Sequence, residues 1–277
     1  MRYVELNNGE RVPALGVGTW RMGENRARRG DEIEVLKLAL DLGLKLIDTA
    51  EMYGEGEAEA VVGEAVAGRR DDVFIVTKIY PHNASSRLTP LACEKSLKRL
   101  GTDRIDLYLL HWRGSHPLSE TVSSFERLKQ QGKIRLWGVS NFDVADMNEL
   151  KTVTAGAGCA ANQILYSLEE RGIEWRLLPD CQKSKIAVMA YCPLGQGRLV
   201  DDKALLPIAR KHSVTPAAIA LAWVLRQPGV IAIPKTSQLN RMRENASAID
   251  LEFDRDDLAA LDKAYPPPAR KQPLATT

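Results

Sequence analysis

The chain has 277 residues, of which 44% are hydrophobic and 27% charged, and its formal net charge is +2. This length and composition are typical of a single soluble barrel domain spanning residues 1–277, and they argue against a disordered or fibrous chain. A charge so close to neutrality gives no electrostatic reason to expect nucleic acid or an anionic membrane as a partner.

The ends and the cysteines point to the cytoplasm. The N-terminal residues MRYVELNNGERVPALG contain no apolar core of a signal peptide, and no apolar run approaches the 18 residues that a membrane span needs. Cys93, Cys159, Cys181 and Cys192 lack metal-ligand spacing. We therefore expect reduced thiols, no metal site and a cytoplasmic protein. We also expect a monomer.

The first predicted element is a short β-hairpin. YVEL and ERVP flank the pair Asn8-Gly9, which favours a two-residue type I′ turn. We expect this hairpin to close the floor of the domain.

Eight apolar, β-branched runs alternate with amphipathic segments along the rest of the chain, and their starts are mostly about 30 residues apart. Near-continuous apolar strands between helices predict a parallel sheet that is buried on both faces. Eight such units predict an α/β fold of the (β/α)8 TIM-barrel type. The expected strands are 12–18, 44–49, 72–78, 104–111, 134–140, 159–165, 185–191 and 229–234.

Two further segments bear on the architecture. The interval between the last two predicted strands is longer than the others and leaves room for an extra helix around Asp202–His212. GAGCAA at 156–161 looks like a dinucleotide-binding glycine motif, but it precedes a predicted strand instead of following one. We interpret it as a loop.

Ionisable residues lie at or just beyond the ends of three neighbouring predicted strands. Asp48 ends the second strand, Tyr53 lies in the loop after it, Lys78 ends the third strand and His111 ends the fourth. Active sites of (β/α)8 barrels form at the carboxyl ends of the strands. The four side chains are therefore expected to face one small volume.

Together these residue types form a proton-transfer device. A tyrosine has a pKa of about 10, and a neighbouring ammonium lowers it and brings the phenolic proton within reach of a developing alkoxide. Lys78 supplies that charge, Asp48 holds Lys78 ionised, and a neutral His111 orients a carbonyl oxygen. The set predicts polarisation and protonation of a carbonyl group, and for carbonyl reduction it lacks only a hydride source.

These residues carry a family resemblance. In the contexts LIDTAEMYGEGEAEAVVGEA, IVTKIY and IDLYLLHW, the four residues resemble the tetrad of the aldo-keto reductases, and GVSNF and IPKT resemble two further signatures in the expected order. The resemblance covers roughly residues 4 to 265. LLHWRG, NQILYSLEERGIEW and LDKAYP are most similar to the compact bacterial branch that includes methylglyoxal reductases.

The resemblance implies a role for each member of the tetrad. Tyr53 would be the general acid, Lys78 its partner, Asp48 the support of Lys78, and His111 the residue that orients the substrate. A nicotinamide cofactor would supply the hydride. The expected reaction is NADPH-dependent reduction of small aldehydes and ketones, such as methylglyoxal-type dicarbonyls and aromatic aldehydes.

The segment IPKTSQLNRMREN supports NADPH by itself. Thr236 and Ser237 are expected to cap the helix after the last strand, whose N-terminus attracts anions, and Lys235 and Arg241 add two cations. This combination suits the adenosine 2′-phosphate that distinguishes NADPH from NADH. By resemblance, Asn245 would contact the adenine.

The remaining cofactor contacts follow from the resemblance. Ser140, Asn141 and Gln163 would bind the carboxamide, and Tyr191 would stack on the nicotinamide. The loop CPLGQGR would follow the pyrophosphate through Leu194 and Gln196, while Thr19, Trp20 and Asp48 would also lie against the cofactor.

Aromatic residues predict the substrate pocket. Trp20, Tyr80 and Trp112 follow predicted strands and would form an apolar wall, with Tyr53 and His111 also contacting the substrate. The loop after His111 is short and few residues follow Tyr265, so we expect a shallow, open pocket for small reactive carbonyls.

Two alternatives remain open at this point. One is a barrel lyase or isomerase in which Lys78 forms a Schiff base. The other is a barrel that holds NADPH as a redox sensor and acts through a partner protein. A complete tetrad and the lack of an obvious docking segment favour the reductase.

Overall fold

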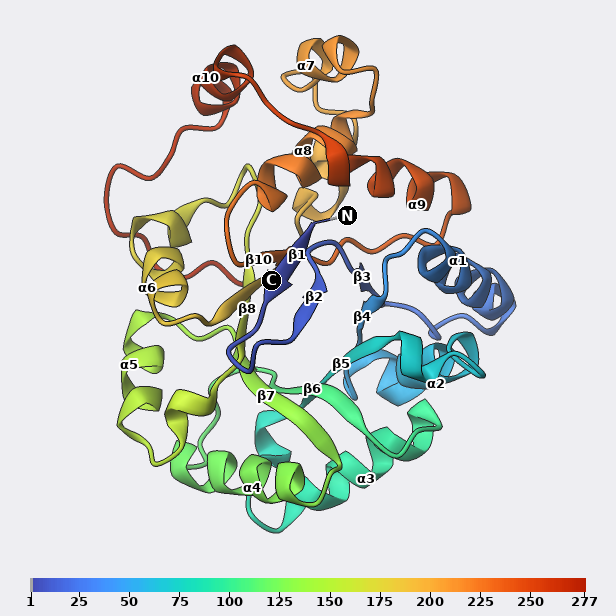
Figure 1. Cartoon of the computed structure of the whole chain (residues 1–277), viewed down its shortest axis with the longest axis vertical. Helices are drawn as coiled ribbons and strands as arrows, with labels where there is room; N and C mark the ends of the chain where they lie inside the picture. The colour runs from blue at the N-terminus through green and yellow to red at the C-terminus, as the bar shows by residue number, and fades with distance from the viewer. Residues whose placement is uncertain (1) are drawn as a thin grey trace.

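In the computed structural model, which describes residues 2–277, eight parallel strands form a ring that is surrounded by helices (Figure 1). Each strand pairs with the next one along the chain. The prediction of a (β/α)8 barrel is confirmed. The strands of the ring are β3 (Val17–Gly18), β4 (Leu46–Asp48), β5 (Phe74–Ile79), β6 (Ile105–Leu110), β7 (Ile134–Ser140), β8 (Ala161–Leu165), β9 (Ala187–Tyr191) and β10 (Val230–Ala232).

Backbone hydrogen bonds close the ring between β3 and β10. The amide of Gly16 donates to Ala232 O at 2.9 Å, and the amide of Gly18 donates to Pro234 O at 3.0 Å. A Cβ atom on Gly18 would lie only 2.9 Å from Ile233 O. Glycine at this position therefore permits the two strands to approach closely enough to close the barrel.

The first predicted strand, 12–18, proves to be two elements. Arg11–Pro13 forms β2 of the hairpin, in which Pro13 pairs with Tyr3, and only Val17–Gly18 forms barrel strand β3. The residues between them cross from the hairpin to the barrel, with a single bridge from Leu15 to Ala232. The sequence gives no sign of this change of pairing partner, because the apolar run continues through it.

The hairpin itself is confirmed, but its predicted turn is wrong. β1 (Tyr3–Glu5) pairs antiparallel with β2, and the loop between Leu6 and Glu10 contains three residues. A type I′ turn needs positive φ at two successive residues, whereas in this loop only Gly9 has it, at 83°. The Asn8 side chain instead accepts a hydrogen bond from the Glu10 amide at 3.0 Å.

Helices cover the outside of the barrel (Figure 1). An extra helix before α8 confirms the prediction for 202–212, and Gly156–Gly158 is a short 3-10 turn between α5 and β8, as expected of a loop. No helix among residues 2–277 is long and apolar enough to cross a membrane. The helices are α1 (Arg29–Asp41), α2 (Glu57–Ala65), α3 (Leu88–Leu100), α4 (Leu118–Gln130), α5 (Val144–Thr152), α6 (Leu177–Lys183), α7 (Leu206–Lys211), α8 (Pro216–Leu225), α9 (Leu239–Ala246) and α10 (Arg255–Ala264).

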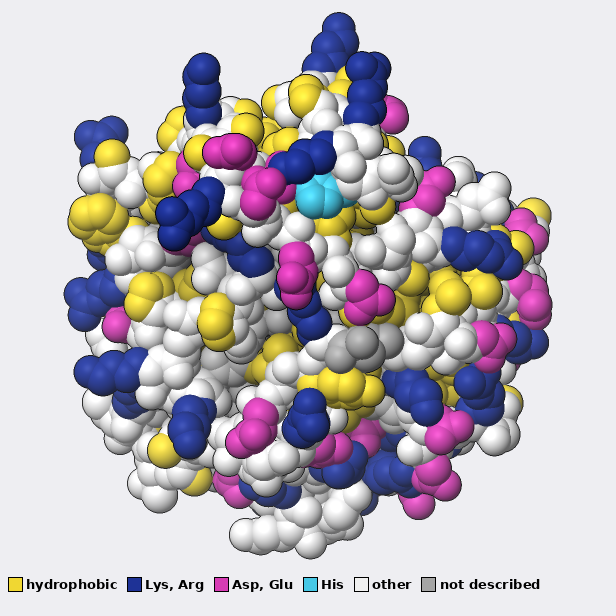
Figure 2. Space-filling model, turned by 45° about the horizontal axis from the view of Figure 1, so that its top comes forward, with side chains coloured by type: hydrophobic (Ala, Val, Ile, Leu, Met, Phe, Trp, Pro, Cys, Tyr) yellow, Lys and Arg dark blue, Asp and Glu magenta, His cyan; other side chains and the backbone are white. Residues whose placement is uncertain are grey.

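The core lies inside the ring and between the ring and the helices. Every residue of β5 and of β6 is buried, and so is all of α8 after its first proline. On the face that Figure 2 shows, Lys and Arg side chains are interspersed with Asp and Glu side chains. The barrel strands have continuous apolar sequences because both of their faces are covered.

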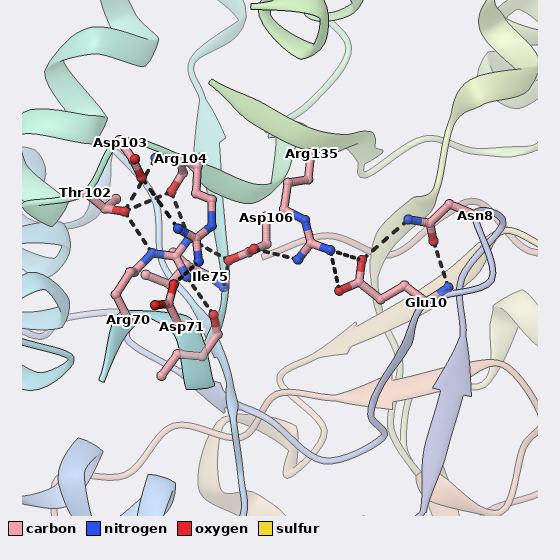
Figure 3. Close-up of polar contacts among 11 residues, drawn as sticks. Asn8, Glu10, Arg70, Asp71, Ile75, Thr102, Asp103, Arg104, Asp106 and Arg135 are labelled. Atoms are coloured by element: carbon pink, nitrogen blue, oxygen red, sulfur yellow. Dashed lines mark hydrogen bonds and ion pairs between the residues drawn. The ribbon is translucent and has the colours of Figure 1, made fainter. Parts of the chain in front are cut away.

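A charged network holds the hairpin to the floor of the barrel (Figure 3). The buried carboxylate of Asp106 on β6 accepts from Arg70 at 2.7 Å, from Arg135 at 3.0 Å and from the Ile75 amide at 2.8 Å. Arg135 also bonds Glu10, next to β2, at 2.9 Å. One carboxylate thus ties β5, β6 and β7 together, and Arg135 extends the tie to the hairpin.

We predict that Asp106→Ala lowers the free energy of unfolding by about 2 kcal/mol, because two arginines and a buried amide lose their acceptor. Urea denaturation followed by circular dichroism measures the loss. Asp71→Ala is the matched control, since Asp71 pairs with Arg104 at the same end of the barrel but is exposed. An equal loss in both variants would show that burial of Asp106 does not matter.

Candidate active site

A cavity of about 560 Å³, which we call the main cavity, opens at the carboxyl ends of the barrel strands. Predicted residues from both the tetrad and the cofactor set line it, so one cavity brings together most of the predicted site. Those that line it are Trp20, Asp48, Tyr53, His111, Trp112, Ser140, Asn141, Gln163, Tyr191, Leu194, Gln196, Lys235, Thr236, Arg241 and Asn245.

The ammonium of Lys78 lies behind the cavity wall and joins the tetrad. Its Nζ donates to Asp48 Oδ2 at 2.8 Å, to Thr49 O at 2.7 Å and to Tyr53 Oη at 3.1 Å. The residue is 0% exposed. All three acceptors come from β4 and the loop after it, so a strand end and its loop supply every hydrogen bond of the ammonium.

Burial and the neighbouring charge have opposite effects on the pKa of Lys78 and on that of Asp48. Burial lowers the pKa of Lys78, but Asp48 and Tyr53 outweigh it, so the pKa stands above its usual value and the amine is protonated. Burial also raises the pKa of Asp48, against the influence of Lys78 and Gln163. The carboxylate is held by a cation on one oxygen and by the Gln163 amide, at 2.7 Å, on the other.

The predicted direction of the Tyr53 pKa is wrong. Burial raises this pKa above its usual value, and the opposing effect of Lys78 does not compensate for it. Sequence indicates which charge neighbours the phenol but not how deeply the phenol is buried. The consequence is that Tyr53 is a protonated phenol at neutral pH, and Lys78 makes its ionisation easier than burial alone would allow.

His111 lies beside Tyr53, with ring centroids 5.8 Å apart and an edge-to-face arrangement. Burial, followed by the charge of Lys78, lowers the His111 pKa to about 3. The imidazole is therefore neutral at physiological pH, as the sequence predicts. Its Nδ1 is buried without a hydrogen-bond partner among the described residues.

The residues expected at the nicotinamide form one hydrogen-bonded group. Tyr191 Oη donates to Asn141 Oδ1 at 2.8 Å, and Asn141 Nδ2 donates to His111 O at 3.2 Å. Ser140 Oγ donates to Gln163 O at 3.0 Å. The ends of β7, β8 and β9 are thus connected to the backbone of His111.

At the other end of the cavity, the predicted helix cap is wrong. α9 begins at Leu239, its N-cap is Gln238, and no side chain caps its first turn. Thr236 Oγ1 instead accepts from the Gln238 amide at 3.1 Å. The amides of the first turn of α9 therefore remain available to an anion beside Lys235 and Arg241.

Three predicted contact residues do not line the cavity. Thr19 is buried and donates to Asp48 O at 3.0 Å, so it supports the strand end instead. Ser237 lies outside the lining. Tyr80 also lies outside it, and its ring packs edge-on against Trp112 with centroids 5.9 Å apart.

Comparison with known proteins now identifies the family, because a sequence model of the aldo/keto reductase family matches residues 14–266. The chain belongs to the aldo/keto reductase family. It is an oxidoreductase, as the resemblance predicts.

Several relatives match this aldo/keto reductase over nearly its full length. Methylglyoxal reductase YeaE of Escherichia coli is 49% identical over 99% of the chain and 98% of that protein, and a glyoxal reductase of Bacillus subtilis is 36% identical over 94% and 91%. The structure of a Klebsiella pneumoniae aldo/keto reductase in complex with NADP and acetate has a TM-score of 0.97, with 48% identity and 99% of each chain covered.

The lining of this reductase also contains residues to which the sequence assigned no individual contact. Arg21 lies over the Trp20 ring, with its guanidinium carbon 4.5 Å from the ring centroid, and Met52 lies in the loop before Tyr53. Cys192 and Glu244 adjoin predicted residues. Their signal was proximity in sequence to Trp20, Tyr53, Tyr191 and Asn245, which alone does not reveal where a side chain points.

The C-terminal residues lie against the cavities, whereas the sequence predicts a shallow, open pocket. Residues 271–275 line a second cavity of about 340 Å³ together with Trp175, and Thr277 lines the main cavity. Leu274 packs against the core. A few residues after α10 therefore suffice to reach the site, which the count of residues after Tyr265 did not indicate.

Backbone strain concentrates at the mouth. Among the described residues, eight that are not glycine have positive φ, and four of these line the main cavity. Left-handed conformations in such residues have an energetic cost and cluster at functional sites. The four are Arg21, Asn141, Cys192 and Gln196.

We predict that the buried neutral His111 makes the reductase acid-sensitive. Below pH 6.5 the unfolded chain protonates this histidine, whereas the folded protein does so only near pH 3, so stability falls as pH is lowered through that window. Between pH 7 and pH 4, wild type should lose about 3 kcal/mol more than His111→Gln, which cannot titrate. Urea denaturation at both pH values measures this, and equal losses would contradict a neutral buried imidazole.

Proposed function

We propose that this aldo/keto reductase uses NADPH to reduce small aldehydes and ketones, including methylglyoxal-type dicarbonyls and aromatic aldehydes, to alcohols. The observation that carries the proposal is the contact of Lys78 Nζ with both Tyr53 Oη and Asp48 beside a neutral His111. The activities that name YeaE and the Bacillus subtilis relative support small dicarbonyls as substrates.

Tyr53 acts as the general acid. A carbonyl that gains a hydride becomes an alkoxide, and the phenol donates its proton to that oxygen. The phenolate that remains lies 3.1 Å from the Lys78 ammonium, which stabilises it, while Asp48 keeps Lys78 charged and in place. The raised pKa of Tyr53 keeps the proton in place until the oxygen becomes basic.

His111 orients the carbonyl. A neutral imidazole can donate one hydrogen bond without adding a charge to the cavity, and the low pKa of His111 maintains that state. Since the His111 ring lies next to the Tyr53 ring, a carbonyl oxygen between them can accept a hydrogen bond from each. Two donors at one oxygen polarise the carbonyl and fix which face of it is open.

The residues of the cavity fit NADPH, which supplies the hydride from its nicotinamide ring when bound. Ser140, Asn141, Gln163 and Tyr191 provide amide, hydroxyl and ring surfaces near the tetrad, for the carboxamide and the ring. Leu194 and Gln196 line the same cavity and would follow the pyrophosphate, and Asn245 would contact the adenine. Lys235, Arg241 and the uncapped first turn of α9 favour a phosphate monoester.

The aromatic mouth suits small, planar carbonyl compounds. Trp20 and Trp112 are both exposed and border the cavity beside Tyr53. Large ring faces bind planar molecules through contact area and stacking instead of directed polar bonds. We propose Trp20 and Trp112 as the substrate-contacting aromatics, with Tyr80 as the support behind Trp112.

The bonding of Lys78 disfavours a Schiff-base mechanism, because a protonated amine with three acceptors has no lone pair for a carbonyl carbon. The complete tetrad favours catalysis over a purely sensing role. We further propose that the enzyme is a cytoplasmic monomer without nucleic-acid or membrane partners. The four free cysteines of the structure agree with a reducing compartment.

Tyr53→Phe should reduce kcat for methylglyoxal by a factor of about 10² to 10⁴, since the proton donor is lost. The affinity for NADPH should change less than about two-fold, because the hydroxyl serves the chemistry and not the dinucleotide. NADPH oxidation at 340 nm and cofactor fluorescence titration measure the two quantities. Full kcat in this variant would refute the general-acid role.

Arg241→Ala should weaken NADPH binding about ten- to 100-fold by removing a charge-assisted bond to the 2′-phosphate. Binding of NADH, which lacks that phosphate, should change little. Titration of both dinucleotides into both proteins provides the comparison, and Arg243→Ala on the same helix is a control because Arg243 does not line the cavity. Equal weakening of NADH and NADPH would contradict the assignment.

A further inference from the structure

We propose that Glu51 is a positioning residue that sets the aromatic wall of the substrate pocket and thereby favours planar aromatic carbonyl substrates. The proposal builds on the reductase function proposed above. Glu51 does not line the main cavity, so it acts through the residues that it holds.

Glu51 occupies a key place in the loop between Asp48 and Tyr53. Its amide donates to Lys78 O at 3.3 Å, so the residue is tied to the end of β5, next to the tetrad. The side chain is largely buried, with the residue 9% exposed. No lysine, arginine or histidine among residues 2–277 forms an ion pair with it, which is unusual for a buried glutamate.

The carboxylate holds the turn that follows β5. Its Oε1 accepts from the Tyr80 amide at 2.7 Å and from Asn83 Nδ2 at 3.1 Å. These two donors begin and end the segment that contains the 3-10 turn Pro81–Asn83. A single oxygen therefore fixes both ends of the turn to the loop that carries Tyr53.

The turn in turn supports Trp112. The Tyr80 ring lies edge-on to Trp112, with centroids 5.9 Å apart, and stacks on His82 at 4.7 Å. A Cβ on Gly114 would lie 2.5 Å from Pro81 Cβ, so the loop after β6 packs directly on the turn. Contacts thus run from Glu51 through Tyr80 and Pro81 to the segment that presents Trp112 to the cavity.

This arrangement separates orientation of the substrate from chemistry. The tetrad is held by Lys78 and its acceptors, none of which is the Glu51 side chain. Loss of the carboxylate frees the turn and the Trp112 wall but leaves the proton donor in place. A planar aromatic aldehyde, which needs the wall, should be affected more than methylglyoxal, which is too small to cover an indole face.

The experiment compares Glu51→Ala, Glu51→Gln and wild type by steady-state kinetics with saturating NADPH. The substrates are methylglyoxal and 4-nitrobenzaldehyde. In Glu51→Ala we expect KM for the aromatic aldehyde to rise about ten-fold while its kcat changes less than about two-fold. For methylglyoxal, both constants should stay within about two-fold. Glu51→Gln keeps the Oε1 acceptor and should restore wild-type KM.

Two further variants serve as controls. Glu120→Ala removes a carboxylate that accepts from the Ser86 amide at 2.6 Å, further along the same connection, and should leave both substrates unchanged. Asn83→Ala removes one of the two donors to Glu51 and should raise KM for the aromatic aldehyde in the same direction but less. Asn83→Ala also provides the test if Glu51→Ala does not fold.

Specific outcomes would overturn the proposal. One is an unchanged KM for the aromatic aldehyde in both Glu51→Ala and Asn83→Ala. Another is an equal loss of kcat for both substrates, which would mean that Glu51 positions the Tyr53 loop and not the aromatic wall. Failure of Glu51→Gln to restore KM would also count against it. If wild type itself reduces neither carbonyl, the proposed function fails, and that result is distinct from the others.

Discussion

The structure of the site depends on the fully buried ammonium of Lys78. An unpaired charge at this depth would cost several kcal/mol, so the fold must bring acceptors to it from the start. Asp48, the Thr49 carbonyl and Tyr53 meet this requirement within one strand end and its loop. The contacts that stabilise the buried lysine are therefore the same contacts that place a phenol beside a cation.

The barrel is what the sequence predicts most fully. Eight apolar runs at regular intervals leave few other architectures, because both faces of every strand must be covered. The errors occur where a local change of direction has no apolar signature. The run 12–18 continues without interruption although its first part pairs in the hairpin, and Asn8-Gly9 suggested a tighter turn than the three-residue loop that forms.

For the site, the sequence predicts where residues near strand ends lie, but it does not predict the effects of side-chain burial. Asp48 ends β4, Lys78 is the penultimate residue of β5 and His111 directly follows β6, so barrel geometry alone brings them together. The raised pKa of Tyr53 and the place of Tyr80 behind Trp112 depend on how neighbouring loops pack, which no single segment encodes. The same holds for α9, whose start at Leu239 shifts Thr236 from helix cap to turn residue.

These differences divide the enzyme into two layers with different constraints. Asp48 on β4 and Lys78 on β5 are buried and bonded to each other, and Lys78 fixes the Tyr53 phenol of the loop after β4, so the proposed proton donor and its charge partner leave little freedom for change. The loops above them carry the strained residues Arg21, Asn141, Cys192 and Gln196 and the turn held by Glu51. Substitutions in this upper layer can reshape the cavity without moving the phenol. We therefore expect substrate range to depend on these loops, and reaction type to depend on the residues bonded to Lys78.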